Sequence, residues 1–372
     1  NSGTLSIDNA KIEATITENG AAYGIENTST GTVTIGKDDG TVPSLTTPII
    51  KGMTYGIYNN GTLNYYDGVI EGKEVNSIYG TVTANASGYN LTISKEGPTE
   101  DYIVDEGNEV TFLEKIYVAH LKSNNTNYVY MSEALNAATS DDEITLLRNI
   151  YTTEPITIRS GKKLVIDLNG KTITNSIEGY IFENSGTLEI KDSQKQERTT
   201  EDQIISSSYN AIHNKSNGTL TITDVVISSS YTVANRYMIY NQGTLNLNNT
   251  DLKMTTSVSE DYAIYNEATG KVTINGGSIS TVNTKAGKNT DILNTYGIYN
   301  NGGEIELNSM NITGSSDYSY QMIYGIYNKS GKLQMTNTEI NESVLSYSTL
   351  YGLYNDSDKS VIIGEDSEDK GW

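Results

Sequence analysis

Side chains that could support hydrolysis or proton transfer are scarce in this chain of 372 residues. It contains no cysteine, two histidines (His120 and His213) and four arginines (Arg148, Arg159, Arg198 and Arg236). None of the arginines lies within a run of acidic residues on a predicted strand. The adjacent acidic pairs, Asp38-Asp39, Asp141-Asp142, Glu260-Asp261 and Glu368-Asp369, fall in predicted turns. Two glycosidase carboxylates could still converge from distant segments, about 5–10 Å apart, but these residue types favour a non-catalytic protein.

The acidic residues could also bind a metal ion. Without cysteine, disulfide bonds and thiolate metal sites are excluded. The stretch Glu365-Asp366-Ser367-Glu368-Asp369 offers oxygen ligands of the kind that calcium prefers. It lacks the fixed spacing of an EF-hand or of a Gly-Gly-x-Gly-x-Asp repeat. We therefore interpret it as a solvated acidic loop, and we predict neither a metal nor a cofactor.

The candidate binding residues are tyrosines, of which the chain has 28. A motif Tyr-Gly-Ile-Tyr-Asn recurs, with its clearest copies at Tyr55, Tyr296 and Tyr324. Side chains alternate along a strand, so the motif isoleucine should point inward and the second tyrosine outward. The second tyrosines are Tyr58, Tyr240, Tyr265, Tyr299, Tyr327 and Tyr354. Exposed rings with polar tips suit sugars and protein partners; alternatively, the rings stack on one another and only stabilise the sheet.

His213 takes the place of the second tyrosine in another copy of the motif. We therefore interpret it as a substitution within the tyrosine row rather than as a general base.

Each copy of the motif closes with an asparagine. The motif asparagines are Asn27, Asn59, Asn184, Asn214, Asn241, Asn266, Asn300, Asn328 and Asn355. Asparagine tolerates the left-handed conformation at a bend, and its amide can bond the local backbone. Amides repeated in register can also bond one another. We predict that these residues form a structural ladder.

These residues need a repeating frame to position them. From Asn184 onward, successive motif asparagines are 25 to 34 residues apart, which indicates a solenoid, a propeller or an array. In one such unit we expect Tyr237, Ile239 and Asn241 to share the inner face of a strand. Two further short strands carry the inward residues Leu245, Leu247, Leu252 and Met254. The sequence predicts an all-β, right-handed parallel β-helix with three short strands per coil, stacked about 4.8 Å apart.

A longer repeat organises the chain into domains. Residues 1–44 align without a gap on residues 329–372, at a shift of 328. We therefore expect residues 1–90 to be the last coils of a first β-helix and residues 144–372 to form a second. The junction, 91–143, contains strand candidates and a helix near 131–138, with Ser132 as N-cap, that caps the open first coil. On this view the chain is a fragment of an array.

One region resembles a known family. The run Tyr130-Met131-Ser132-Glu133-Ala134-Leu135 is followed by Ile144-Thr145-Leu146-Leu147 and by Ile166-Asp167-Leu168-Asn169-Gly170-Lys171-Thr172-Ile173. Together they resemble the opening of pectate-lyase-like β-helix domains in surface proteins and adhesins of low-GC Gram-positive bacteria. The resemblance implies the same fold as the repeats. It leaves activity open, because this superfamily mixes polysaccharide-cleaving enzymes with non-catalytic binding proteins.

The charge limits the partners that we expect. A formal net charge of −21 repels nucleic acid and anionic lipid, and no apolar run is long enough to span a membrane. We predict a non-catalytic segment of an extracellular bacterial surface protein that binds glycans or proteins through its β-helix faces and adjoins further superunits of its parent chain. The alternative is a structural stalk or surface-layer repeat without a ligand. A polysaccharide lyase or hydrolase is a third, less favoured hypothesis.

Overall fold

The computed structural model is an all-β solenoid. It describes residues 1–16, 20–38, 47–97, 108–175, 178–195, 205–207, 209–285, 292–344, 347–356, 358 and 361–364. Strands make up 62% of it and helix 3%, arranged in about 11 turns. This confirms the predicted β-helical fold class with one short helix. Contacts divide the chain into two units, Asn1–Tyr117 (unit 1) and Val118–Trp372 (unit 2), and the division lies within the predicted junction.

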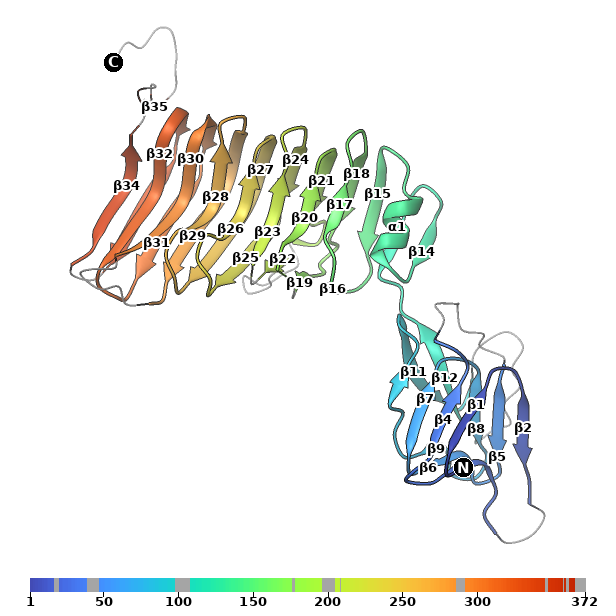
Figure 1. The fold of residues 1–372 in the computed structure, drawn as a ribbon. Coiled ribbons are helices and arrows are strands. Elements are labelled where there is room, and N and C mark those ends of the chain that lie inside the picture. Colours follow the sequence, from blue (N-terminus) through green and yellow to red (C-terminus); the bar gives the residue numbers. More distant parts are fainter. Residues whose placement is uncertain are drawn as a thin grey trace. The chain divides into compact units, whose positions relative to one another are not determined.

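Unit 1 has three faces, each a separate sheet of stacked strands (Figure 1). Face A contains β1 (Thr4–Ile7), β4 (Thr32–Ile35), β7 (Thr62–Tyr65) and β10 (Ala84–Asn85). Face B contains β2 (Lys11–Ala14), β5 (Ile49–Gly52), β8 (Val69–Gly72), β12 (Glu109–Lys115) and β11 (Tyr89–Ser94). Face C contains β3 (Tyr23–Asn27), β6 (Tyr55–Asn59) and β9 (Asn76–Tyr79). The coils pair in parallel, whereas β12 joins β8 in the antiparallel direction and ends the parallel stacking on face B.

Unit 2 repeats the same three faces over more coils. Face A contains β15 (Asp142–Leu146), β18 (Lys163–Asp167), β21 (Thr187–Lys191), β24 (Thr219–Thr223) and β35 (Val361–Ile363). Face B contains β16 (Ile150–Thr152), β19 (Ile173–Asn175), β22 (Ile205–Ser207), β25 (Val226–Tyr231), β31 (Asn311–Ser316) and β33 (Glu339–Val344). Face C contains β17 (Ile156–Ile158), β20 (Tyr180–Asn184), β23 (Asn210–Asn214), β26 (Tyr237–Asn241), β28 (Asp261–Glu267) and β34 (Thr349–Asn355).

Four long strands of unit 2 run around a corner and serve two faces. The strands β27 (Thr244–Thr256) and β29 (Lys271–Asn283) pass from face A to face B. The strands β30 (Leu293–Asn308) and β32 (Gln321–Thr336) pass from face C to face A. The 328-residue repeat is visible in the pairing, since Leu5 lies opposite Val33 in unit 1 and Leu333 opposite Val361 in unit 2.

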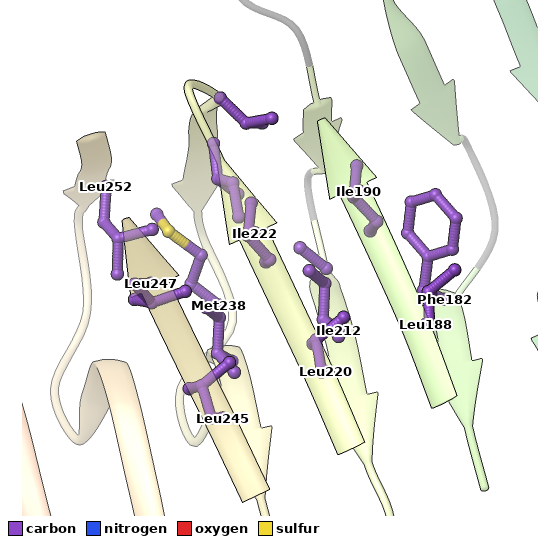
Figure 2. Packing of buried hydrophobic residues seen from close by; sticks show 14 of the residues in the cluster. Phe182, Leu188, Ile190, Ile212, Leu220, Ile222, Met238, Leu245, Leu247 and Leu252 are labelled. Carbon is purple, nitrogen blue, oxygen red and sulfur yellow. The ribbon is translucent and has the colours of Figure 1, made fainter. Parts of the chain in front are cut away.

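The core of unit 2 consists of aliphatic rows that run from coil to coil (Figure 2). On face A, Leu188, Leu220 and Leu245 pair in register, and so do Ile190, Ile222 and Leu247. All six side chains are at most 1% exposed. A single coil has no second layer to bury these residues, so each coil depends on its neighbours for stability.

The first coil of unit 2 is covered by an antiparallel hairpin and a helix. The hairpin comprises β13 (Ala119–Leu121) and β14 (Thr126–Tyr128), and β13 pairs antiparallel with β15. Helix α1 (Met131–Ala137) contacts both hairpin strands and contributes Met131 and Ala134 to the core of the unit. The expected N-cap Ser132 was wrong: the N-cap lies two residues earlier, and Met131, the first helical residue, is buried in the core. Tyr130 is the N-cap residue and makes no capping side-chain bond.

Helix α1 is also the only helix among the described residues, and its seven residues are far too few to cross a bilayer.

Candidate functional site: the tyrosine face

The motif strand on face C does not alternate simply. In β26, Met238 and Ile239 are both buried in the core, while Tyr237 and Tyr240 lie on the outside. The pairing of β26 with β28 matches Tyr237 to Tyr262 and Ile239 to Ile264 but passes over Met238. The expectation that Tyr237 shares the inner face with Ile239 was therefore wrong. Because two consecutive motif residues face inward, both motif tyrosines face outward.

The outward tyrosines of unit 2 form two columns, which we call the tyrosine face. The first column contains Tyr237, Tyr262, Tyr296, Tyr324 and Tyr351, and the second contains Tyr240, Tyr265, Tyr299, Tyr327 and Tyr354. In the first column, the Tyr262 and Tyr296 ring centroids are 4.9 Å apart and their planes differ by 8°. In the second, the Tyr265 and Tyr299 centroids are 5.0 Å apart and their planes differ by 11°. Rings of different columns meet edge to face, as Tyr262 and Tyr265 do at 88°.

The two columns differ in exposure. Tyr262, Tyr296 and Tyr324 of the first column are only 6–7% exposed, whereas the second column is half-buried. Burial raises the pKa of Tyr265 and that of Tyr299 to about 12. At neutral pH both phenols therefore keep their protons and can act as hydrogen-bond donors.

Carboxylates and amides border the tyrosine face at β28 and β30. The Tyr240 hydroxyl donates a hydrogen bond to Glu267 Oε1 at 2.9 Å, and Asn301 Nδ2 donates one to Glu267 Oε2 at 3.1 Å. The Tyr262 hydroxyl likewise donates to Glu260 Oε2 at 2.9 Å. Burial, reinforced by the bond to Glu267, raises the pKa of Tyr240 well above its usual value.

Tyr58 belongs to unit 1 and is therefore not part of the tyrosine face of unit 2. Its ring stacks on Tyr79 at 4.4 Å and on Tyr23 at 4.8 Å. Of the six tyrosines singled out from the sequence, the structure brings five together in unit 2 and places Tyr58 in this separate cluster.

The motif asparagines lie inside the coils and bond one another. In unit 1 the amide of Asn27 donates to Asn59 at 2.7 Å. In unit 2 a continuous chain of such bonds joins Asn184, Asn214, Asn241, Asn266, Asn300, Asn328 and Asn355, at 2.7–3.0 Å. A glycine lies against the ladder in most coils; a Cβ atom on Gly218 would be 2.3 Å from Asn214 Oδ1. The packing of the amides thus explains the glycine of the motif turn.

The two histidines are placed in different surroundings. His213 pairs with Tyr240 in register, and its ring lies 5.1 Å from the rings of Tyr180 and Tyr240. Its Nε2 atom is 3.1 Å from Gln242 Oε1. His120 lies on the hairpin of unit 2, with Nδ1 2.8 Å from Asn127 Oδ1.

The charged residues considered for catalysis or metal binding are dispersed. Arg148 and Arg159 are exposed, and Arg236 forms an ion pair with Glu178 at 3.0 Å. Arg198 and the acidic run 365–369 lie outside the described residues. Within the described ranges, no three acidic or histidine side chains come together in a way that could hold a metal ion.

The expectation that the acidic pairs fall in turns was wrong for Asp142 and Asp261, which begin β15 and β28 and are buried, and sequence analysis did not single out Glu342. Asp261 is fully buried, and burial raises its pKa to about 6. Burial raises the pKa of Glu342 to about 8, and neither of its oxygens has a hydrogen-bond partner among the described residues. Glu342 could have been found from the sequence, because it occupies an inward position of β33, opposite Gly314.

The comparisons with known proteins found no match to this chain. No protein-family model matches the chain, and neither curated proteins nor solved structures gave a match.

Proposed function

We propose that this chain is a rigid, non-catalytic solenoid segment of an extracellular surface protein, with a structural role as a stalk or surface layer. One observation carries the proposal: the rings of the tyrosine face are stacked on one another. Tyr265 lies between Tyr240 and Tyr299, and Tyr299 lies between Tyr265 and Tyr327. Tyr299 therefore has a stacked ring on both faces, whereas Tyr265 is stacked on Tyr299 and meets Tyr240 in a tilted contact at 39°. A sugar ring has no free face of Tyr299 on which to stack.

The stacked rings have a structural effect of their own. An aromatic pair contributes about 0.5–1.5 kcal/mol beyond the area that it buries. The tyrosine face adds such contacts at every step from Tyr237 to Tyr351 and from Tyr240 to Tyr354. Together with the asparagine ladder inside the same face, these contacts fix the register of neighbouring coils. A fixed register keeps each coil in the same position relative to the next one along the solenoid.

A second function, recognition of a glycan or protein, is favoured by the polar border. The rings of the second column leave their edges and hydroxyl groups partly exposed, beside Glu267 and Asn301. Hydroxyl, carboxylate and amide groups at regular spacing can hydrogen-bond sugar hydroxyls without contact to a ring face.

Two double variants separate these functions. Tyr265→Ser/Tyr299→Ser removes the stacking, whereas the matched control Tyr265→Phe/Tyr299→Phe keeps it and removes only the hydroxyl groups. For a structural role we expect the Ser variant to lose about 2–4 kcal/mol of unfolding free energy, from lost stacking and burial, and the Phe variant to stay near the wild type. Denaturant unfolding followed by circular dichroism measures both.

The same variants test recognition on an array of bacterial and animal glycans. Binding by the wild type that the Phe variant loses, with its stability intact, would support recognition over the structural role. Unchanged stability of the Ser variant would contradict the structural proposal.

A further inference from the structure

A partly exposed lysine, a buried glutamate and a buried asparagine meet on face B of unit 1. Lys51 lies on β5, and Glu71 lies opposite it on the neighbouring strand β8. Asn108 immediately precedes β12, the antiparallel strand that pairs with the other edge of β8. The three residues are far apart in the sequence, so no sequence motif indicates their association.

The Glu71 carboxylate contacts both the Lys51 amine and the Asn108 amide nitrogen. Lys51 Nζ is 2.6 Å from Glu71 Oε2, and Asn108 Nδ2 donates a hydrogen bond to Glu71 Oε1 at 3.0 Å. The lysine amine and the asparagine carboxamide therefore lie on the two oxygens of the same group. This places a nucleophile, a proton acceptor and an acyl carbon within one small cluster.

The cluster is shielded from solvent. Asn108 is 2% exposed and Glu71 7% exposed, while the Lys51 side chain is 24% exposed. A hollow of about 120 Å³, lined by Lys51, Glu71, Glu13 and Lys73, connects to it. The burial of Asn108 and Glu71 limits the access of water to the reacting amide, which favours amide formation over hydrolysis. The hollow beside Lys51 and Glu71 is open to solvent.

From this geometry we infer that Lys51 and Asn108 form an intramolecular isopeptide bond, with Glu71 as the proton shuttle. Glu71 accepts a proton from the lysine ammonium group, and the neutral Nζ attacks Asn108 Cγ. The Nζ–Cγ bond forms, the Cγ–Nδ2 bond breaks, and a proton passes through Glu71 to the departing nitrogen. The products are one secondary amide and ammonia, which leaves as ammonium with the proton from Glu71. No oxidant, metal or cofactor takes part.

The bond has a clear structural consequence. It links β5 to the start of β12 across β8, and so fastens the closing antiparallel hairpin of β11 and β12 to the parallel coils. An edge that is otherwise held by strand hydrogen bonds and by the packing of Tyr89 and Leu113 into the core becomes covalently closed.

The test is the intact mass of the full chain, kept at neutral pH in its folded state. We expect the wild type to be lighter than its sequence by one ammonia molecule. Proteolysis should release a branched peptide that joins the segments around Lys51 and Asn108. Glu71→Gln and Lys51→Arg should retain the full mass, whereas Lys73→Arg, a change at the neighbouring lysine of the hollow, should show the same loss as the wild type.

Two results would overturn the inference. The first is a wild-type chain that keeps its full mass after prolonged incubation. The second is an ammonia loss that persists in Lys51→Arg, because an asparagine that cyclises on its own backbone also releases ammonia. Circular dichroism of each variant shows whether it is folded. The mass of the wild type and its branched peptide test for the isopeptide bond without any variant.

Discussion

The ladder asparagines other than Asn355 are buried, and each amide has several hydrogen-bond partners. Asn241 is 0% exposed; it accepts a hydrogen bond from Asn214 at 2.8 Å and donates to Asn266 at 2.8 Å and to the Gly243 carbonyl at 3.0 Å. A shorter or apolar side chain at this site removes a ladder bond on each side: the acceptor for Asn214 Nδ2 and the donor to Asn266 Oδ1. The loss of these buried bonds explains why this position needs asparagine.

A substitution in the ladder should therefore lower the free energy of unfolding substantially. We expect Asn241→Ala to lower the free energy of unfolding by about 2–4 kcal/mol, because it removes a ladder bond on each side. Asn246→Ala is the matched control on the outer side of β27, where the asparagine makes only a long 3.5 Å contact to Thr221. Denaturant unfolding of the two variants measures the difference. Equal losses would show that the ladder adds nothing beyond ordinary packing.

The buried carboxyl of Glu342 should make stability depend on pH. Burial raises its pKa from an ordinary 4.5 to about 8, so the folded chain holds this proton over a range where the unfolded chain releases it. As pH rises from about 4.5 to 8, this group therefore lowers the free energy of unfolding. Glu342→Gln should remove the effect and gain about 1–3 kcal/mol near pH 8, allowing for solvent screening.

Unfolding curves at pH 5 and pH 8 test this expectation. Glu339→Gln on the same strand is the control, since that side chain is exposed. A gain for Glu342→Gln of the same size at both pH values would contradict a raised pKa at this carboxyl group.

At the scale of elements, antiparallel strands cover one end of the parallel stack in each unit, as far as the structure describes it. Unit 1 ends its parallel stacking on face B with the antiparallel strand β12, and unit 2 begins with an antiparallel hairpin and helix α1. Exposed strand edges pair readily with other chains. Here antiparallel strands of the same chain cover the edges of the coil strands β8 and β15. Middle coils need no such device because they cover one another.

Helix α1 should matter through its buried face alone. Ala134 is 0% exposed, so Ala134→Asp places an unpaired charge in the core of unit 2. We expect a loss of about 3 kcal/mol or more of unfolding free energy. Asn136→Asp adds the same charge on the exposed side of the helix and should be nearly neutral. Thermal unfolding compares the two variants; similar losses would mean that the helix does not act as a cover.

These elements also show what the sequence could predict. The asparagine spacing and the alternating Leu245 and Leu247 were sufficient for the solenoid, because they depend on local periodicity. The inner position expected for Tyr237 was wrong, because Met238 and Ile239 are both buried and simple alternation does not describe this strand. The cluster of Lys51, Glu71 and Asn108 was out of reach, since it depends on which strands become neighbours.

At the scale of the whole molecule, the two units share the same structural features. Each has three faces, an asparagine ladder and stacked tyrosines, although the coils differ in length. The length differences fall between faces, where a loop can grow without disturbing the register of the strands. Stability is therefore local, and the fold tolerates changes in one coil as long as its edges still match the coils on either side.

The equivalence of the coil at 4–36 and the coil at 332–364 has a consequence for the number of coils. Both coils present matching residues to their neighbours, as Leu5 opposite Val33 and Leu333 opposite Val361 show. A chain in which one of these coils replaced the other would keep leucine opposite valine on face A. The pairing of this face therefore permits a change in the number of coils without a new kind of contact between them.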